Sequence, residues 1–380
     1  MTSLDGLRGV AALIVMLHHL YLVAVPALKA GGGSATWSAY WWVSETPLKI
    51  LTAGSEAVLV FFVLSGLVVA LPALRKKGFS WAGFLSGRML RIYLPVWASL
   101  TIATALIWLL PRDRSTVTDG SWVGNTNATT TTVGSLLNQA SLTIPSYGIN
   151  NVLWSLRWEM AFSVLLPVFV VVALLVRRHW LLSLGVAFAL SLAGALTGVD
   201  ALQFLPVFFI GTLMAVRLDA IREWIRRRTL RPRARLWGIT LVVGSLLLLI
   251  GHWMLRPLVP AGSLPGGVLT QLAALGAAGL VLAAIAVPFL RRALDSRPCQ
   301  WLGRVSFSLY LIHVPIIATL AFLLGDDKWW LVALVTIPLA LLGAWGFHMV
   351  IERPSHRLAQ RTSAAVATVE SDLVTKLTRQ

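Results

Sequence analysis

Stretches of about 20 mostly apolar residues recur along this chain of 380 residues, with charged or polar segments between them. A run of this length matches a helix that crosses the hydrocarbon core of a bilayer. Because lipid offers no hydrogen-bond partners, the backbone of such a run must pair within a helix. Ten runs are expected to span a membrane: 7–28, 50–72, 92–111, 153–176, 180–198, 201–217, 236–255, 267–290, 302–324 and 329–350. The sequence therefore predicts an all-α, polytopic helical bundle.

Composition supports this class. Charged residues make up 12% of the chain and hydrophobic residues 57%, with a mean hydropathy of +0.78. A soluble chain carries about a quarter charged residues. The single cysteine, Cys299, excludes an internal disulfide and any metal site built from several cysteines. We expect a multi-pass protein of the cell (plasma or inner) membrane and no metal.

The basic residues are distributed unequally between the two sets of alternate loops. Of the 32 lysines and arginines, 25 fall on the side that carries both termini, 6 on the other, and Arg157 lies inside a span. The positive-inside rule then places both termini in the cytoplasm. The net charge of +17 follows from this topology, with anionic headgroups of the lipid bilayer as neighbours, and no nucleic acid partner is needed. Residues 1–354 are expected to form the membrane domain and residues 355–380 a polar cytoplasmic tail.

The first predicted span holds ionisable residues. Arg8 and His19 are eleven residues apart, almost three helical turns, so they share one face about 16 Å apart along the axis. His18 points to a different face. An ionisable side chain inside a membrane is costly and is a functional candidate by default. The alternative is a histidine satisfied by a neighbouring helix.

Two further segments allow both a structural and a functional interpretation. Residues 61–66, Phe-Phe-Val-Leu-Ser-Gly, favour close helix packing at Ser65. Arg88 and Arg91 have the i, i+3 spacing that puts both guanidinium groups on one helix face. Such a pair suits a phosphorylated ligand, but ordinary positive-inside charge would produce the same pattern.

Three predicted spans carry further ionisable groups. Glu159 lies in the fourth span with Arg157 close by in sequence, so an ion pair and a role in a site are both open. His313 lies near the middle of the ninth span. Glu352-Arg353-Pro354 closes the tenth and indicates a helix stop with an interfacial ion pair.

Taken in order from Leu4 to Pro354, these segments resemble the acyltransferase family 3 membrane proteins. The resemblance rests on six patterns: L-D-G-L-R-G with a histidine eleven residues after the arginine (Arg8, His19), F-F-V-L-S-G (from Phe61), R-x-x-R (Arg88, Arg91), W-S-L-x-x-E (Trp154 to Glu159), S-x-Y-L-x-H (Ser308 to His313) and E-R-P (from Glu352). The ordered set carries the resemblance rather than any single pattern. One departure is Arg157-Trp158, where family members commonly have smaller or acidic residues.

The resemblance implies ten core helices and an O-acyltransferase that moves a short acyl group from acyl-CoA to a hydroxyl of a glycan or a glycosylated small molecule. The acceptor could be an envelope glycan or a metabolite such as a macrolide. Arg8, Arg88 and Arg91 would bind the donor, and His19 would act as general base. His313 and Glu159 would orient the base or the acceptor. A proton-coupled transporter that uses His19, His313 and Glu159 as a relay is the alternative from another functional class.

Overall fold

The computed structural model describes residues 1–31, 36–75, 78–230, 232–260 and 262–377. Within these ranges the chain is helical and has no strand, which confirms the all-α class. The long helices are α1 (Thr2–Ala30), α3 (Gly54–Arg75), α4 (Trp81–Leu109), α7 (Leu153–Val176), α8 (Trp180–Thr197), α9 (Asp200–Val216), α10 (Leu218–Thr229), α11 (Ala234–Leu255), α12 (Leu264–Ala286), α14 (Arg297–Leu324), α15 (Trp329–Phe347) and α16 (Arg353–Leu377). Short helical segments connect them: α2 (Ala39–Ser44), η1 (Pro47–Thr52), η2 (Arg114–Thr116), α5 (Trp122–Thr126), α6 (Val133–Ser141), η3 (Arg177–His179), η4 (Arg256–Leu258), α13 (Pro288–Leu294) and the π-helical turn η5 (His348–Glu352).

Each of the ten predicted spans overlaps one long helix, but the count of ten is not confirmed. Among the described residues, eight helical stretches are long and apolar enough to cross a membrane, or nine if α9 and α10 form one crossing bent by 70°. The difference arises partly because α7, η3 and α8 run on without a break, so that two expected spans form one helical stretch from Leu153 to Thr197.

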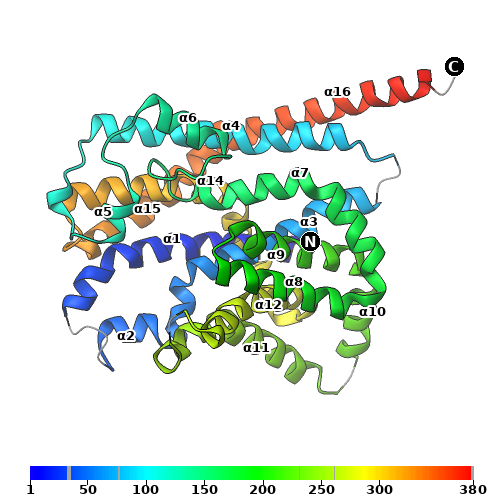
Figure 1. Ribbon diagram of the computed structural model, residues 1–380, viewed down its shortest axis with the longest axis horizontal. Coiled ribbons are helices and arrows are strands. Elements are labelled where there is room, and N and C mark those ends of the chain that lie inside the picture. Colours follow the sequence, from blue (N-terminus) through cyan, green and yellow to red (C-terminus); the bar gives the residue numbers. More distant parts are fainter. Residues whose placement is uncertain (32–35, 76–77, 231, 261, 378–380) are drawn as a thin grey trace. The chain divides into compact units, whose positions relative to one another are not determined.

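The chain divides into two compact units. Unit 1 comprises residues 1–74 and 168–306, and unit 2 comprises residues 75–167 and 307–380. In unit 1, α8 with α9 and α11 with α12 form antiparallel pairs, drawn in green to yellow in Figure 1. Gly194 and Gly276 allow these contacts, because a Cβ on Gly194 would lie 2.2 Å from the backbone nitrogen of Gln203 and one on Gly276 would lie 2.6 Å from that of Leu249.

In unit 2, the C-terminal helix α16 packs along α4, as the red and cyan ribbons show in Figure 1. Gly83 and Gly87 face Ser363 at this contact, and the Ser80 hydroxyl donates to Glu370. The predicted helix stop at Glu352-Arg353-Pro354 is wrong. A proline at the second position of a helix removes an N–H that needs no intrahelical partner, so α16 begins at Arg353 directly after η5.

Candidate functional site

Helix α1 is fixed against the start of α14 through the glycines and the arginine of its opening motif. A Cβ on Gly6 would lie 2.1 Å from the Leu294 carbonyl oxygen, and one on Gly9 would lie 2.4 Å from the Gly303 nitrogen. Only glycine permits backbones to approach this closely. The L-D-G-L-R-G pattern is therefore a docking surface for the segment from α13 to α14.

Arg8 completes this contact. Its Nε donates to the Ser306 hydroxyl at 3.0 Å and its Nη2 donates to the Gly303 carbonyl at 3.1 Å, while Asp5 lies 3.6 Å away. The side chain nevertheless stays 39% exposed. Arg8 thus holds two helices together and still presents part of its guanidinium group to solvent or to a ligand.

His19 is buried, with 8% of its surface exposed, and its orientation is set by its own helix. Nδ1 lies 2.9 Å from the Val15 carbonyl oxygen. Because a carbonyl can only accept, Nδ1 carries the proton, and in the neutral ring Nε2 is then the basic nitrogen. In this tautomer Nε2 can act as a general base. His18 is oriented differently, since its Nδ1 donates at 2.8 Å to the Thr52 carbonyl on η1.

Arg88 and Glu159 are brought together by unit 2 although 71 residues separate them. Nη2 of Arg88 donates to Glu159, and its Nε donates to the Ser163 hydroxyl at 3.2 Å. The side chain of Arg88 is 11% exposed and that of Glu159 is 27% exposed. Arg157, the sequence neighbour that left the pairing of Glu159 open, instead places its guanidinium over the Trp158 ring at 5.0 Å. The partner of Glu159 is therefore Arg88.

The i, i+3 spacing predicted the same role for Arg88 and Arg91, but the two side chains differ in exposure. Arg91 lies one turn further along α4 and is exposed. The two arginines therefore differ in exposure: the side chain of Arg88 is largely removed from water beside a carboxylate, whereas Arg91 is exposed.

His313 is fully buried in α14, and its Nδ1 donates at 2.8 Å to the Leu309 carbonyl. The ring therefore has the same tautomer as His19. Nearby on the helix, Tyr310 shares a 2.6 Å hydrogen bond with Ser155 of α7. This bond links the S-x-Y-L-x-H pattern to the W-S-L-x-x-E pattern inside unit 2.

A second link in unit 2 involves the E-R-P pattern. The Ser308 hydroxyl donates to Glu352 at 2.6 Å, and His348 Nδ1 lies 3.0 Å from the same carboxylate oxygen. His348 and Ser163 were not anticipated from the sequence. Their signals were present, because His348 stands four residues before Glu352 and Ser163 four residues after Glu159, spacings that bring side chains together on a helix.

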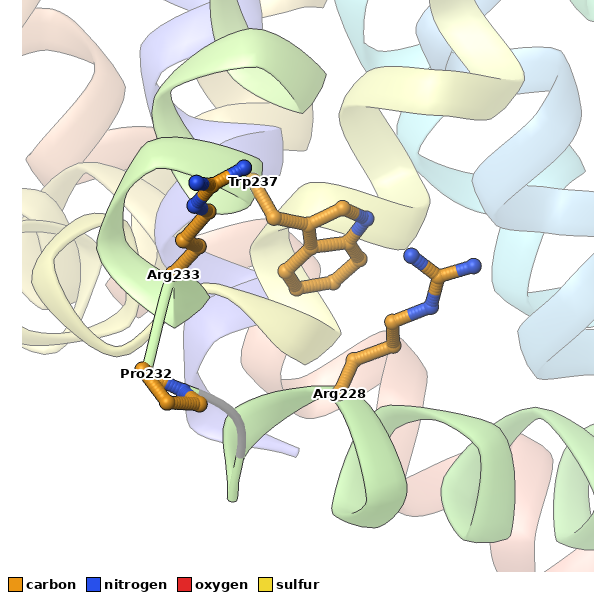
Figure 2. Close-up of a pocket in the computed structure, with 4 residues that line it drawn as sticks. All are labelled: Arg228, Pro232, Arg233 and Trp237. Atoms are coloured by element: carbon orange, nitrogen blue, oxygen red, sulfur yellow. The ribbon is translucent and has the colours of Figure 1, made fainter.

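Unit 1 has a pocket of about 330 Å³ at the junction of α10 and α11. Figure 2 shows its lining residues: Arg228, Pro232, Arg233 and Trp237. Neither arginine has a carboxylate partner among the described residues. None of the residues that the sequence assigned to the site lines this pocket.

Comparisons with known proteins agree with this set of motifs. The model of the acyltransferase 3 family, described as an acyltransferase domain, matches residues 1–349. Acyltransferase MdmB of Streptomyces mycarofaciens is 30% identical over 405 residues, which cover 99% of this chain and 97% of that protein. O-acetyltransferase PaAT-1 of Phomopsis amygdali is 26% identical over 380 residues, which cover 85% of this chain and 73% of that protein. No solved structure matches the chain significantly. The chain therefore belongs to the acyltransferase 3 family and is an acyltransferase of groups other than aminoacyl groups.

Proposed function

We propose that the protein is a membrane O-acyltransferase that uses acyl-CoA as donor and a hydroxyl of a carbohydrate or a glycosylated molecule as acceptor. The observation that carries the proposal is the His19 tautomer, because Nδ1 donates to Val15 and Nε2 is left as the basic nitrogen. An alcohol is a weak nucleophile at neutral pH, and a positioned imidazole that removes its proton accelerates attack by about 10²–10⁴-fold. The name of PaAT-1, an O-acetyltransferase, favours an acetyl group.

The proton balance of the reaction is simple. The acceptor hydroxyl gives its proton to His19 as its oxygen attacks the thioester carbon. The C–S bond then breaks, and the proton passes from His19 to the departing thiolate. No net acid or base is consumed, so one histidine is sufficient for both transfers.

Acyl-CoA carries several phosphates, and we expect arginines on the cytoplasmic side of the membrane to bind them. Of the arginines predicted to bind the donor, Arg8 and Arg91 keep exposed side-chain surface. In this proposal both termini are cytoplasmic and the membrane is the plasma or inner membrane, in keeping with the 25-to-6 division of basic residues. A cysteine placed at Thr130 in a Cys299→Ser protein should react with an impermeant reagent on intact cells, and labelling at Arg227→Cys instead would reverse this orientation.

The test is acyl transfer by the purified protein in nanodiscs. Acetyl-CoA serves as donor, and methyl glucoside, N-acetylglucosamine and erythromycin represent three classes of acceptor. A gain of about 42 Da, from an acetyl group that replaces the hydroxyl hydrogen, is expected on at least one acceptor. His19→Ala should lower the rate by about 10²–10⁴-fold, whereas His18→Ala should lower it less.

Both variants should insert normally, because removing a polar group from a membrane helix does not disfavour insertion. An unmodified acceptor that crosses the membrane of proteoliposomes would favour a transporter. Full activity in His19→Ala would remove the general base from this proposal while leaving the family membership intact.

A further inference from the structure

Lys49 is held inside unit 1 by a rigid segment. It lies on η1, where Thr46 caps the first turn by accepting from the Leu48 N–H at 3.2 Å and the Lys49 N–H donates to the Thr46 carbonyl at 2.9 Å. The segment packs against α1, α2 and α11. The backbone of Lys49 is therefore fixed by local hydrogen bonds and by three neighbouring elements.

The side chain of Lys49 is enclosed by aromatic rings. It is 0% exposed and is one of the largest fully buried side chains among the described residues. Nζ lies 4.0 Å from the centre of the Trp253 ring and 4.6 Å from that of Tyr21. Ring faces attract a cation, but they do not replace the hydrogen bonds of an ammonium group. Among the described residues Nζ has no hydrogen-bond partner.

Glu56, the carboxylate that acts electrostatically on Lys49, and Glu45 are bound to other groups. Glu56 accepts from Trp253 Nε1 at 2.9 Å and lies 3.2 Å from His252 Nε2. Glu45 pairs with Arg256 at 3.4 Å. A buried ammonium whose three N–H groups lack acceptors is costly, and burial accordingly lowers the pKa of Lys49 to about 8. A buried polar group without a hydrogen-bond partner calls for a structural or functional explanation.

The surroundings of Lys49 connect it to the candidate base. Tyr21, which contributes a ring face, also lies beside His18 at 6.4 Å between ring centres, and His18 lies 5.4 Å from His19. Gly54 packs directly on the His18 ring, since a Cβ there would lie 2.5 Å from it. Lys49 on η1 therefore contacts the part of α1 that carries Tyr21 and His18, and His18 is the sequence neighbour of His19.

The position of Lys49 along the helices favours the acceptor over the donor. Trp253 stands near the end of α11, a helix of 22 residues that is about 33 Å long at 1.5 Å per residue. The arginine-rich α10 contacts the start of that helix. The proposed topology puts α10 on the cytoplasmic side, from which acyl-CoA comes, so the opposite end of α11, near Lys49, is left for the acceptor.

We propose that the Lys49 ammonium, between the Tyr21 and Trp253 rings, donates a hydrogen bond to an oxygen atom of the acyl acceptor. An aromatic enclosure with one placed donor is typical of sites that take a largely apolar surface bearing hydroxyl groups, which describes the face of a sugar ring. The inference rests on the proposed function and adds to it the residue that binds the acceptor.

The test compares Lys49→Met with Lys29→Met. Methionine keeps the length and apolar character of the stem and removes the charge. Lys29 is the matched control, because it also lies over a tyrosine ring, Tyr40 at 5.3 Å, but is exposed. Rates are measured with acetyl-CoA and with whichever of the three acceptor probes is acetylated fastest, varying each substrate separately. Lys49→Met should raise the KM for the acceptor at least tenfold and leave the KM for acetyl-CoA unchanged, and Lys29→Met should change neither.

The outcomes separate this inference from the proposed function. If the parent acetylates none of the probes, the proposed function fails. If the parent is active and folded Lys49→Met has the parental KM for the acceptor, or loses donor and acceptor affinity equally, the role of Lys49 is refuted. Lys49→Gln gives the same comparison if the methionine variant does not fold. In the parent, the acceptor probe without donor should raise the thermal midpoint, because a ligand that binds only the folded state stabilises it, and Lys49→Gln should lose that increase.

Discussion

Helices α4 and α10 both carry arginines at helical spacing, yet they use them in different ways. On α10, Arg226 and Arg227 pair with Glu223 of the same helix, and their side chains are 65% and 71% exposed. On α4, Arg88 pairs with Glu159 of α7, and its side chain is 11% exposed. A local pair on a surface is dispensable, whereas a long-range pair removed from water requires both of its partners.

The difference shows how to separate topology from function in a basic membrane protein. Exposed arginines with partners one turn away satisfy the positive-inside rule and need no further explanation. A buried arginine with a partner on another helix fixes the packing of the unit that contains it. Arg91 lies on the same helix as Arg88 but is exposed, like the arginines of α10.

The largest effect is expected from breaking the Arg88 pair. Arg88→Gln leaves the Glu159 carboxylate partly buried without its cation, and breaking such a pair costs about 3–5 kcal/mol when the site is fully buried. Because Glu159 is 27% exposed, we expect a loss near the lower end of this range. Thermal unfolding in detergent measures this loss of stability, and Arg227→Gln serves as the exposed control.

A double substitution sharpens the same comparison. Arg88→Gln with Glu159→Gln removes both charges and leaves two amides that can bond to each other, so most of the lost stability should return. A double variant as unstable as Arg88→Gln alone would show that the unpaired Glu159 carboxylate is not the cause of the loss. Loss of stability in Arg227→Gln of equal size would abolish the distinction between α4 and α10.

An intermediate effect is expected from Arg91. Arg91→Lys keeps the charge but loses the planar fork that binds phosphate through two N–H groups. The KM for acetyl-CoA should rise several-fold while the thermal midpoint stays within the error of the parent. Measurement of acetyl transfer at varied donor concentration tests this expectation. An unchanged KM would assign Arg91 to topology along with the arginines of α10.

The sequence predicted the all-helical class and the positions of the apolar helices, because hydropathy over about 20 residues is a local property, but the predicted count of ten spans is not confirmed. It located Arg8, His19, Arg88, Glu159 and His313 through their motifs, and their membership of one catalytic site stays a prediction. It could not pair Glu159 with Arg88, since no local signal marks a partner 71 residues away. The nearby Arg157 was the obvious candidate, and a contact with the Trp158 ring took its place.

Lys49 shows the same limit more clearly. In the sequence it is one of six basic residues in the loops assigned to the outside, with nothing to distinguish it from Lys29. Its burial depends on Tyr21 of α1 and Trp253 of α11, which are 232 residues apart in the chain (253 minus 21). Tertiary packing alone makes one lysine fully buried and leaves the other exposed.

The smallest effect is expected at Glu223. Glu223→Gln removes the carboxylate that accepts from Arg226 at 2.8 Å and from Arg227 at 2.8 Å. Because these groups are exposed, solvent and salt already screen most of the attraction. Acetyl transfer and the thermal midpoint should match those of the parent at 0.15 M salt (roughly physiological ionic strength), and any difference should appear only when salt is lowered. A midpoint that falls as far as in Arg88→Gln, and does so at high salt, would mean that the charges of α10 support the fold as strongly as the buried pair does.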